Sequence, residues 1–164
     1  MIMKTPSLTA AVFLALATTA LAAPKAYWVA YKSNLLNIQI SVPSDWKPTK
    51  VPNALAFRYD DLVGGTAAVG VLKSQQITSA EAAADKEMRM EGHPADWTRS
   101  QATVSGMKAI KITGLDAKDS SKKMVHYYVE TPNGVYIVQC LGTADRWSTF
   151  GPIFSTILTK LKFF

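Results

Sequence analysis

The sequence has 164 residues, of which 18 are Lys or Arg and 12 are Asp or Glu, giving a formal net charge of +6 at pH 7. The basic residues are scattered, which favours a solvated surface over the alternative of contact with anionic lipid or polysaccharide. The single cysteine, Cys140, excludes an intramolecular disulfide. Because Cys140 lies in an apolar run, we expect a buried, inert thiol, with a reactive or intermolecular thiol as the alternative.

Residues 1–22 have the pattern of a cleaved signal peptide. Lys4 is the one charged residue, Ala10–Leu21 is mostly apolar, and Ala20-Leu21-Ala22 is the small-x-small motif that signal peptidase recognises. The apolar stretch is shorter than the roughly 20 residues that span a bilayer, so no retained anchor is expected. No cysteine adjoins the cleavage site, so no lipid anchor is expected either.

Cleavage after Ala22 would leave a single domain of 142 residues (164 minus 22), residues 23–164. Its net charge would be +5, from 17 basic and 12 acidic residues. This length is sufficient for a hydrophobic core. The predicted localisation is periplasmic or secreted, and in that compartment we expect no nucleic-acid partner.

Alternating hydrophobicity predicts the first strands, and capping chemistry predicts the first helix. The strands are expected at Tyr27–Lys32, at Asn37–Val42, around residues 55–59 and at Thr66–Lys73. The pattern Thr78-x-x-Glu81 is interpreted as a capping box that starts an Ala-rich helix reaching Met90. Ala80, Ala84 and Met88 would form the stripe of this helix that packs on a sheet.

The second half of the chain continues with strands and closes with a helix. The strands are expected at Thr98–Val104, Met107–Leu115, Lys122–Glu130 and Val135–Leu141, with a hairpin turn at residues 131–134. A helix is expected from Asp145, with Pro152 either in its first turn or breaking it in two. Its apolar face comprises Trp147, Phe150, Phe154, Ile157, Leu158 and Leu161. About seven strands and two helices, in this order, predict an α+β domain with helices laid on an antiparallel sheet.

The stretch Ile38–Trp46 is an apolar strand that runs into Pro43-x-x-Trp46. In this feature, and in the order of its elements up to Leu161-Lys162-Phe163, the chain resembles the PsbP/DcrB-like superfamily over residues 31–163. The resemblance implies an α-β-α sandwich around a central antiparallel sheet of about six or seven strands. It also implies an interaction role rather than catalysis, since the members share no active site; fold alone does not define chemistry.

Four residues form the candidate partner or ligand surface. His93, Asp96 and Trp97 lie in the loop that follows the first helix, and Trp28 lies near the start of the mature chain. Trp and Tyr are enriched at interfaces, but they also anchor cores of this size. Trp46 and Trp147 are therefore expected in the core, whereas Trp28 and Trp97, at element ends, could be either.

Motifs for catalysis, metal binding and cofactor binding are missing from the sequence. His126 is expected to be a hydrogen-bonded structural histidine, and Asp60-Asp61 a solvated loop edge. Gly64-Gly65 is not followed by the Lys-Ser/Thr of a phosphate loop, and Ser105 lacks the flanking glycines of a nucleophile elbow. The sequence therefore predicts no enzyme, no metal and no cofactor.

The predicted function is that of an exported, non-catalytic binding or accessory protein of the bacterial cell envelope, whose partner is another envelope protein. One alternative is a carrier of a small apolar or lipid ligand held between a helix and the sheet. A second alternative is a hydrolase with an unrecognised site near His93 and Asp96.

Overall fold

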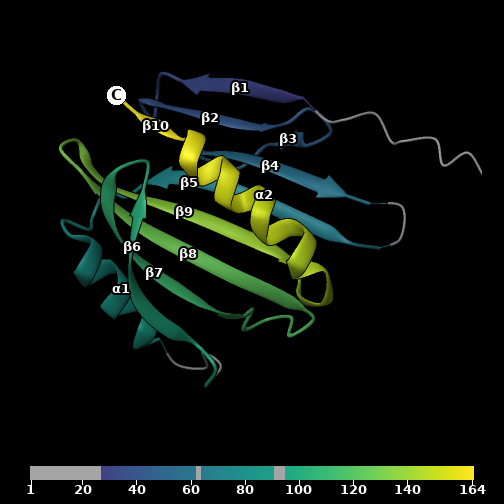
Figure 1. Ribbon diagram of the computed structural model, residues 1–164. Coiled ribbons are helices and arrows are strands. Elements are labelled where there is room, and N and C mark those ends of the chain that lie inside the picture. The colour runs from purple at the N-terminus through teal and green to yellow at the C-terminus, as the bar shows by residue number, and fades with distance from the viewer. Residues whose placement is uncertain (1–26, 62–63, 91–94) are drawn as a thin grey trace, which may run out of the picture.

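The computed structural model describes residues 27–61, 64–90 and 95–164, so the predicted signal peptide and His93 lie outside the described residues. Its centre is a seven-stranded antiparallel sheet in the order β3-β4-β5-β9-β8-β7-β6 (Figure 1). The bounds of these strands are Lys47–Thr49 (β3), Ala54–Asp60 (β4), Thr66–Lys73 (β5), Thr98–Val104 (β6), Met107–Leu115 (β7), Lys122–Thr131 (β8) and Gly134–Thr143 (β9). The predicted α+β class and antiparallel sheet are confirmed.

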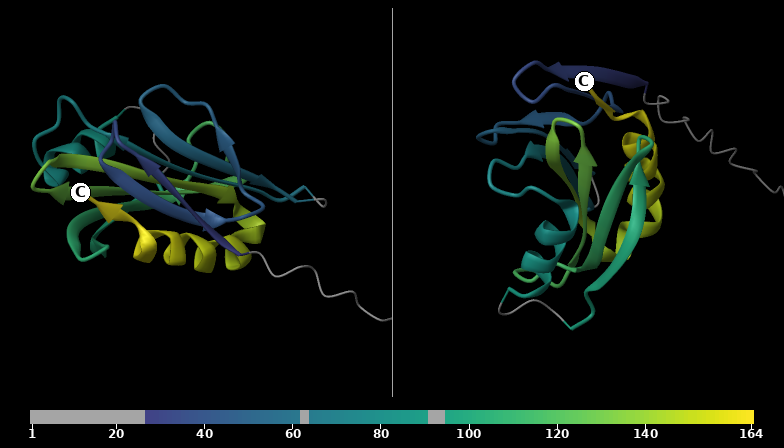
Figure 2. Two further views of the ribbon diagram at one scale, coloured as in Figure 1. Left: turned by 90° about the horizontal axis from the view of Figure 1, so that it is seen from above. Right: turned by 90° about the vertical axis from the view of Figure 1, so that its left-hand side faces the viewer.

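Two helices cover opposite faces of this sheet (Figure 2). Helix α1, Ala80–Met88, contacts β7 and β8, where Ile110, Ile112, Met124 and Tyr128 face it. Helix α2, Trp147–Lys160, follows a short 3-10 turn (η1, Ala144–Arg146) and packs on the other face, which carries Val138 and Cys140. Side chains alternate between the faces of a strand, so neighbouring residues of β8 and β9 serve different cores.

A second, three-stranded sheet lies beside α2 on the same side of the large sheet. It consists of β1 (Trp28–Ser33), β2 (Ile38–Pro43) and β10 (Lys162–Phe163), in the order β1-β2-β10. Ile38, Ile40 and Val42 of β2 are fully buried in the larger core. The sequence predicted β1 and β2 but not their separation from the main sheet, and it missed the short strands β3 and β10. In the described residues, no helix is long and apolar enough to cross a membrane.

The N-cap of helix α1 lies one residue later than predicted. The N-cap is Ser79, whose hydroxyl accepts a hydrogen bond from the Ala82 amide at 3.1 Å, so the capping box starting at Thr78 was wrong. Glu81 instead pairs with Arg99 of β6. The Glu81 carboxylate, which the predicted capping box required, therefore forms an ion pair with a neighbouring strand instead.

Replacing Ser79 with alanine is expected to destabilise the protein by about 1 kcal/mol, because the helix loses its cap. Chemical denaturation of the variant measures this loss. Thr78→Ala is the matched control, and an equal loss in this control would contradict the assignment of Ser79 as the cap.

Helix α2 is continuous through Pro152, contrary to both predicted alternatives. Proline removes the amide that would donate to the carbonyl of Ser148. Both Ser148 and Pro152 are exposed, so water can satisfy this carbonyl and the helix continues. The predicted apolar face is confirmed: Phe150, Phe154, Ile157 and Leu158 are buried.

Candidate functional site

The outer face of the three-stranded sheet carries aromatic and basic side chains. Tyr31 of β1 turns inward and its ring packs on Phe57, with centroids 4.6 Å apart. Alternation along the strand therefore turns Trp28 and Lys32 away from the core. At β10, Phe163 turns inward against Tyr136, so the neighbouring Lys162 and Phe164 turn outward. We call Trp28, Lys32, Lys160, Lys162 and Phe164 the aromatic face.

Lysines and aromatic rings pair directly on the aromatic face. The Nζ atom of Lys160 lies 5.6 Å from the centroid of the Trp28 ring, and that of Lys32 lies 5.2 Å from the Phe164 ring. Trp28 and Phe164 are 37% and 53% exposed, so these rings are open to a partner. The outward positions of β1, β2 and β10 carry no carboxylate, and the face is therefore positively charged.

A cavity of about 260 Å³ adjoins the aromatic face and has Trp28 in its wall. The rest of its wall includes Trp46, Tyr59 and Phe150, which belong to the core, and the ion pair of Arg146 with Asp61. The Nη2–Oδ2 distance of this pair is 3.1 Å, and the other carboxylate oxygen of Asp61 accepts a hydrogen bond from the Gly65 amide at 2.5 Å. Asp61 is thus not the solvated loop edge that the sequence suggested, since its side chain is only 11% exposed.

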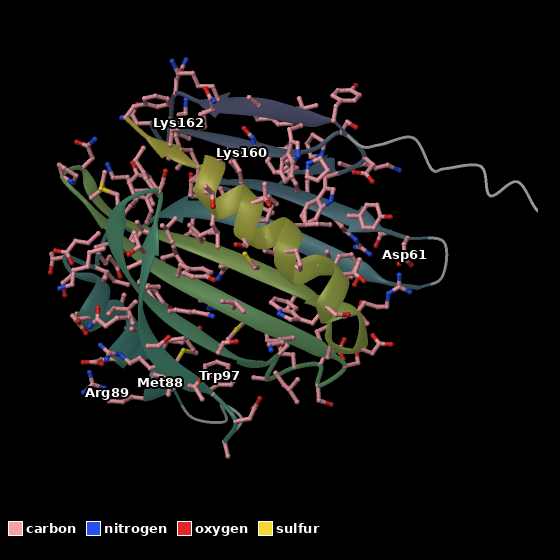
Figure 3. The ribbon with its side chains drawn as sticks, in the orientation of Figure 1. Asp61, Met88, Arg89, Trp97, Lys160 and Lys162 are labelled. Carbon is pink, nitrogen blue, oxygen red and sulfur yellow. The ribbon has the colours of Figure 1, made fainter. Side chains whose placement is uncertain are left out.

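The structure places two other candidate residues, Asp96 and Trp97, together at the start of β6. The Asp96 carboxylate accepts a hydrogen bond from the Leu115 amide at 2.9 Å, and Trp97 Nε1 donates to the Leu115 carbonyl at 2.7 Å. The Trp97 ring lies over Gly114, where a Cβ atom would overlap it. Both side chains therefore join β6 to the end of β7. In Figure 3, Trp97 lies near the end of α1, far from Lys160 and Lys162.

A polar cluster lies between α1 and the sheet. His126 Nδ1 lies 2.7 Å from Oε1 of Glu87, and the hydroxyl of Tyr128 donates to Oε2 of the same carboxylate at 2.5 Å. Burial raises the pKa of Glu87, but the hydrogen bond and charge of His126 and the hydrogen bond from Tyr128 outweigh it, so the pKa lies below its ordinary value. Burial and the contact with Glu87 raise the pKa of Tyr128 well above its ordinary range.

This cluster explains His126, which the sequence predicted to be a hydrogen-bonded structural histidine. Its partner is Glu87 of α1, not Tyr128 or a neighbouring strand. The side chains of His126 and Glu87 are only 14% and 12% exposed, so their contact holds α1 on the sheet. Within the described ranges, no group of three His, Cys, Asp or Glu side chains could hold a metal ion.

Cys140 is buried in the core and its thiol is free. Burial raises the pKa of this thiol well above its ordinary range, which disfavours the reactive thiolate.

Comparison with known proteins agrees with this architecture. No protein-family model matches the sequence. No curated protein matches it. Solved structures do match: cyanobacterial PsbP (CyanoP) from Synechocystis sp. PCC 6803 is 14% identical, with a TM-score of 0.54, over 85% of this chain and 94% of that chain.

Two further solved structures are similar. The Ran-binding protein Mog1p of Saccharomyces cerevisiae is 9% identical with a TM-score of 0.51, over 84% of this chain and 96% of that chain. LpqN, involved in cell envelope biogenesis of Mycobacterium tuberculosis, is 17% identical with a TM-score of 0.48, over 76% of this chain and 82% of that chain. The chain therefore has the PsbP-like fold, and the resemblance inferred from Ile38–Trp46 is confirmed at the level of the fold.

Of the three candidate residues that the structure describes (Trp28, Asp96 and Trp97), Trp28 belongs to the aromatic face and the other two do not. Sequence reasoning missed Lys32, Lys160, Lys162 and Phe164, because they come from both ends of the domain and meet only through the pairing of β10 with β2. The alternation of apolar and basic residues around Phe163 was the one sequence signal for these outward side chains, and it is weak in a strand of two residues.

Proposed function

We propose that this protein is an exported, non-catalytic accessory protein that binds another envelope protein through the aromatic face. The observation that carries the proposal is the pairing of exposed aromatic rings with lysines beside a sheet whose outward strand positions carry no carboxylate. Aromatic side chains are enriched at protein interfaces, and the positive charge of the lysines favours an acidic partner surface.

The fold gives this proposal secondary support. Mog1p, which has a similar fold, is a Ran-binding protein. Binding of a protein partner is thus compatible with this architecture, although fold alone does not define a function. Asp96, the described residue of the hydrolase alternative, already binds the Leu115 amide, and the Glu87 carboxylate already binds His126. The hydrolase alternative therefore has less support.

Site-specific photo-crosslinking tests this proposal. A photoreactive residue in place of Ala30, which is exposed and lies between Trp28 and Lys32, is expected to form one discrete crosslinked product in envelope extract. Trp28→Ala in the same chain should reduce the product at least about tenfold, because exposed tryptophans often dominate binding energy.

The matched control carries the same photoreactive residue in place of Ala82, which is exposed on α1. This position should not give the product. Equal crosslinking from both positions, or a product that Trp28→Ala does not change, would contradict a partner site on the aromatic face.

A carrier of a small apolar or lipid ligand is the second candidate function. A groove of about 230 Å³ crosses the part of the sheet beside α1, and Ala54, Ala56, Ala68, Leu72 and Leu141 contribute to its wall. From the sequence, such a ligand was expected between a helix and the sheet, and the larger cavity beside α2 is lined mostly by polar residues. Lipid that copurifies with the protein in native mass spectrometry, and is lost on Gly70→Leu, would favour the carrier.

A further inference from the structure

A long cleft separates α2 from strands β6, β7 and β8. It consists of two adjoining cavities of about 620 and 380 Å³, which share Lys111, Tyr127 and Ser155 in their walls. The small sheet and α2 together cover the rest of this sheet face, so the cleft is its uncovered part. We call it the α2 cleft. It is distinct from the aromatic face, because no residue of that face lines either cavity.

Two lysines make the α2 cleft positively charged. Lys111 lies in the wall of both cavities and Lys123 in that of the smaller one, while neither cavity is lined by Asp or Glu. Neither lysine forms an ion pair with any residue that the structure describes. Lys123 instead lies over the Trp147 ring, 5.3 Å from its centroid. Lys122, which points to the other face, does have an acidic partner, Asp119.

The two lysines are separated along the cleft. Lys111 pairs in register with Tyr127, four residues after Lys123 on β8, which corresponds to about 13 Å along the strand. This spacing suits an elongated ligand more than a single small ion.

Unpaired hydroxyl groups line the cleft beside the lysines. Ser100 of β6, which pairs in register with Lys111, and Ser155 of α2 contribute hydroxyl groups that form no hydrogen bond with described residues. The Tyr127 hydroxyl also forms no hydrogen bond with described residues. Because no buried polar side-chain atom of the described residues lacks a partner, this hydroxyl is in contact with solvent in the cleft. Burial, with a smaller contribution from Cys140, raises the pKa of Tyr127 to about 12, so its hydroxyl remains a donor at neutral pH.

We propose that the α2 cleft binds a phosphorylated polyol, with Lys111 and Lys123 neutralising the anion and Tyr127, Ser100 and Ser155 bonding the hydroxyl groups. Ammonium groups form strong charge-assisted hydrogen bonds with phosphate oxygens. Neutral hydroxyl groups both donate and accept, as recognition of a polyol requires. The ligand could be a soluble sugar phosphate or the headgroup of a glycerophospholipid, since both carry this chemistry.

Titration followed by heteronuclear NMR tests the proposal. Glucose 6-phosphate and glycerol 3-phosphate are expected to shift the amide resonances of Lys111, Lys123 and Tyr127, whereas glucose at the same concentration should not. Lys111→Met should weaken binding by about tenfold or more, because the charge is lost while the length of the side chain remains. Lys108→Met is the matched control, since Lys108 lies on the same strand but faces the opposite side of the sheet.

Vesicles separate the two sources of the ligand. Sedimentation with phosphatidylglycerol vesicles, but not with phosphatidylcholine vesicles, that depends on Lys111 would indicate a lipid headgroup; binding of the soluble phosphates alone would indicate a free sugar phosphate. Equal binding of glucose, an equal loss in Lys108→Met, or unchanged resonances with every probe would overturn the proposal. Thermal unfolding of both variants verifies that they fold.

Discussion

Replacing Trp46 with alanine is expected to lower the free energy of unfolding by about 3–5 kcal/mol, the range for a large aromatic residue removed from a core. Trp46 is 3% exposed and lies in the turn that joins β2 of the small sheet to β3 of the large sheet. Its ring stacks on Tyr59 of β4, with centroids 6.2 Å apart, and meets the edge of Phe154 of α2 at 5.7 Å. One side chain thus joins the small sheet, the large sheet and α2. Urea denaturation followed by circular dichroism measures the loss.

Trp28→Ala is the matched control for Trp46→Ala. Trp28 is 37% exposed, and we expect its removal to change the free energy of unfolding by less than about 1 kcal/mol. The two substitutions delete the same atoms, so their difference isolates burial. A loss in Trp28→Ala as large as that in Trp46→Ala would make Trp28 a core residue and would remove it from the aromatic face.

Replacing Glu87 with alanine is expected to destabilise the protein by about 1–3 kcal/mol, since it leaves His126 and Tyr128 without their acceptor in a largely buried site. Thermal or urea denaturation measures the effect. Asp85→Asn is the control on the same helix. Its side chain is 51% exposed and its ion pair with Arg99 has a distance of 3.6 Å, so a change below about 1 kcal/mol is expected.

The Glu87 cluster also predicts a dependence of stability on pH. The pKa of Glu87 is lower in the folded protein than its ordinary value of 4.5, so the unfolded chain binds the proton first as the pH falls. The stabilisation by the Glu87 carboxylate is therefore complete above about pH 4.5 and is lost as the pH falls through the folded pKa.

Denaturation curves between pH 7 and pH 3 test this dependence. Glu87→Gln keeps a hydrogen-bonding side chain of the same size but cannot titrate, so its stability should fall less steeply below pH 4.5 than that of the unmodified protein. Parallel curves for the two proteins would show that Glu87 does not carry the low-pH loss.

Local patterns predicted most of the secondary structure because they depend on neighbouring residues. The alternation of Ile38, Ile40 and Val42 indicated a half-buried strand, and all three are fully buried. The helical spacing of the apolar residues likewise predicted the buried face of α2. The strands β3 and β10, of three and two residues, were missed because so short a segment has no period to detect.

The candidate site was less predictable because it depends on contacts between distant segments. Trp28 was identified from its residue type, but Lys160 joins it from 132 positions further along the chain (160 minus 28). Asp96 and Trp97 had the residue types of a site, yet their side chains bind the Leu115 backbone. Their partner lies on another strand, so the sequence around residue 96 contains no sign of it.

The sequence by itself determined the α+β class, the order of the principal elements, the PsbP-like resemblance and the burial of Cys140, since hydrophobic period and turn chemistry act over a few residues. Only the tertiary structure decided that β1, β2 and β10 form a separate sheet, that Glu87 is the partner of His126, and that Lys111 and Lys123 face a cleft without carboxylates. The physical reason is that strand pairing and helix docking join residues that are tens of positions apart, and no local pattern specifies such contacts.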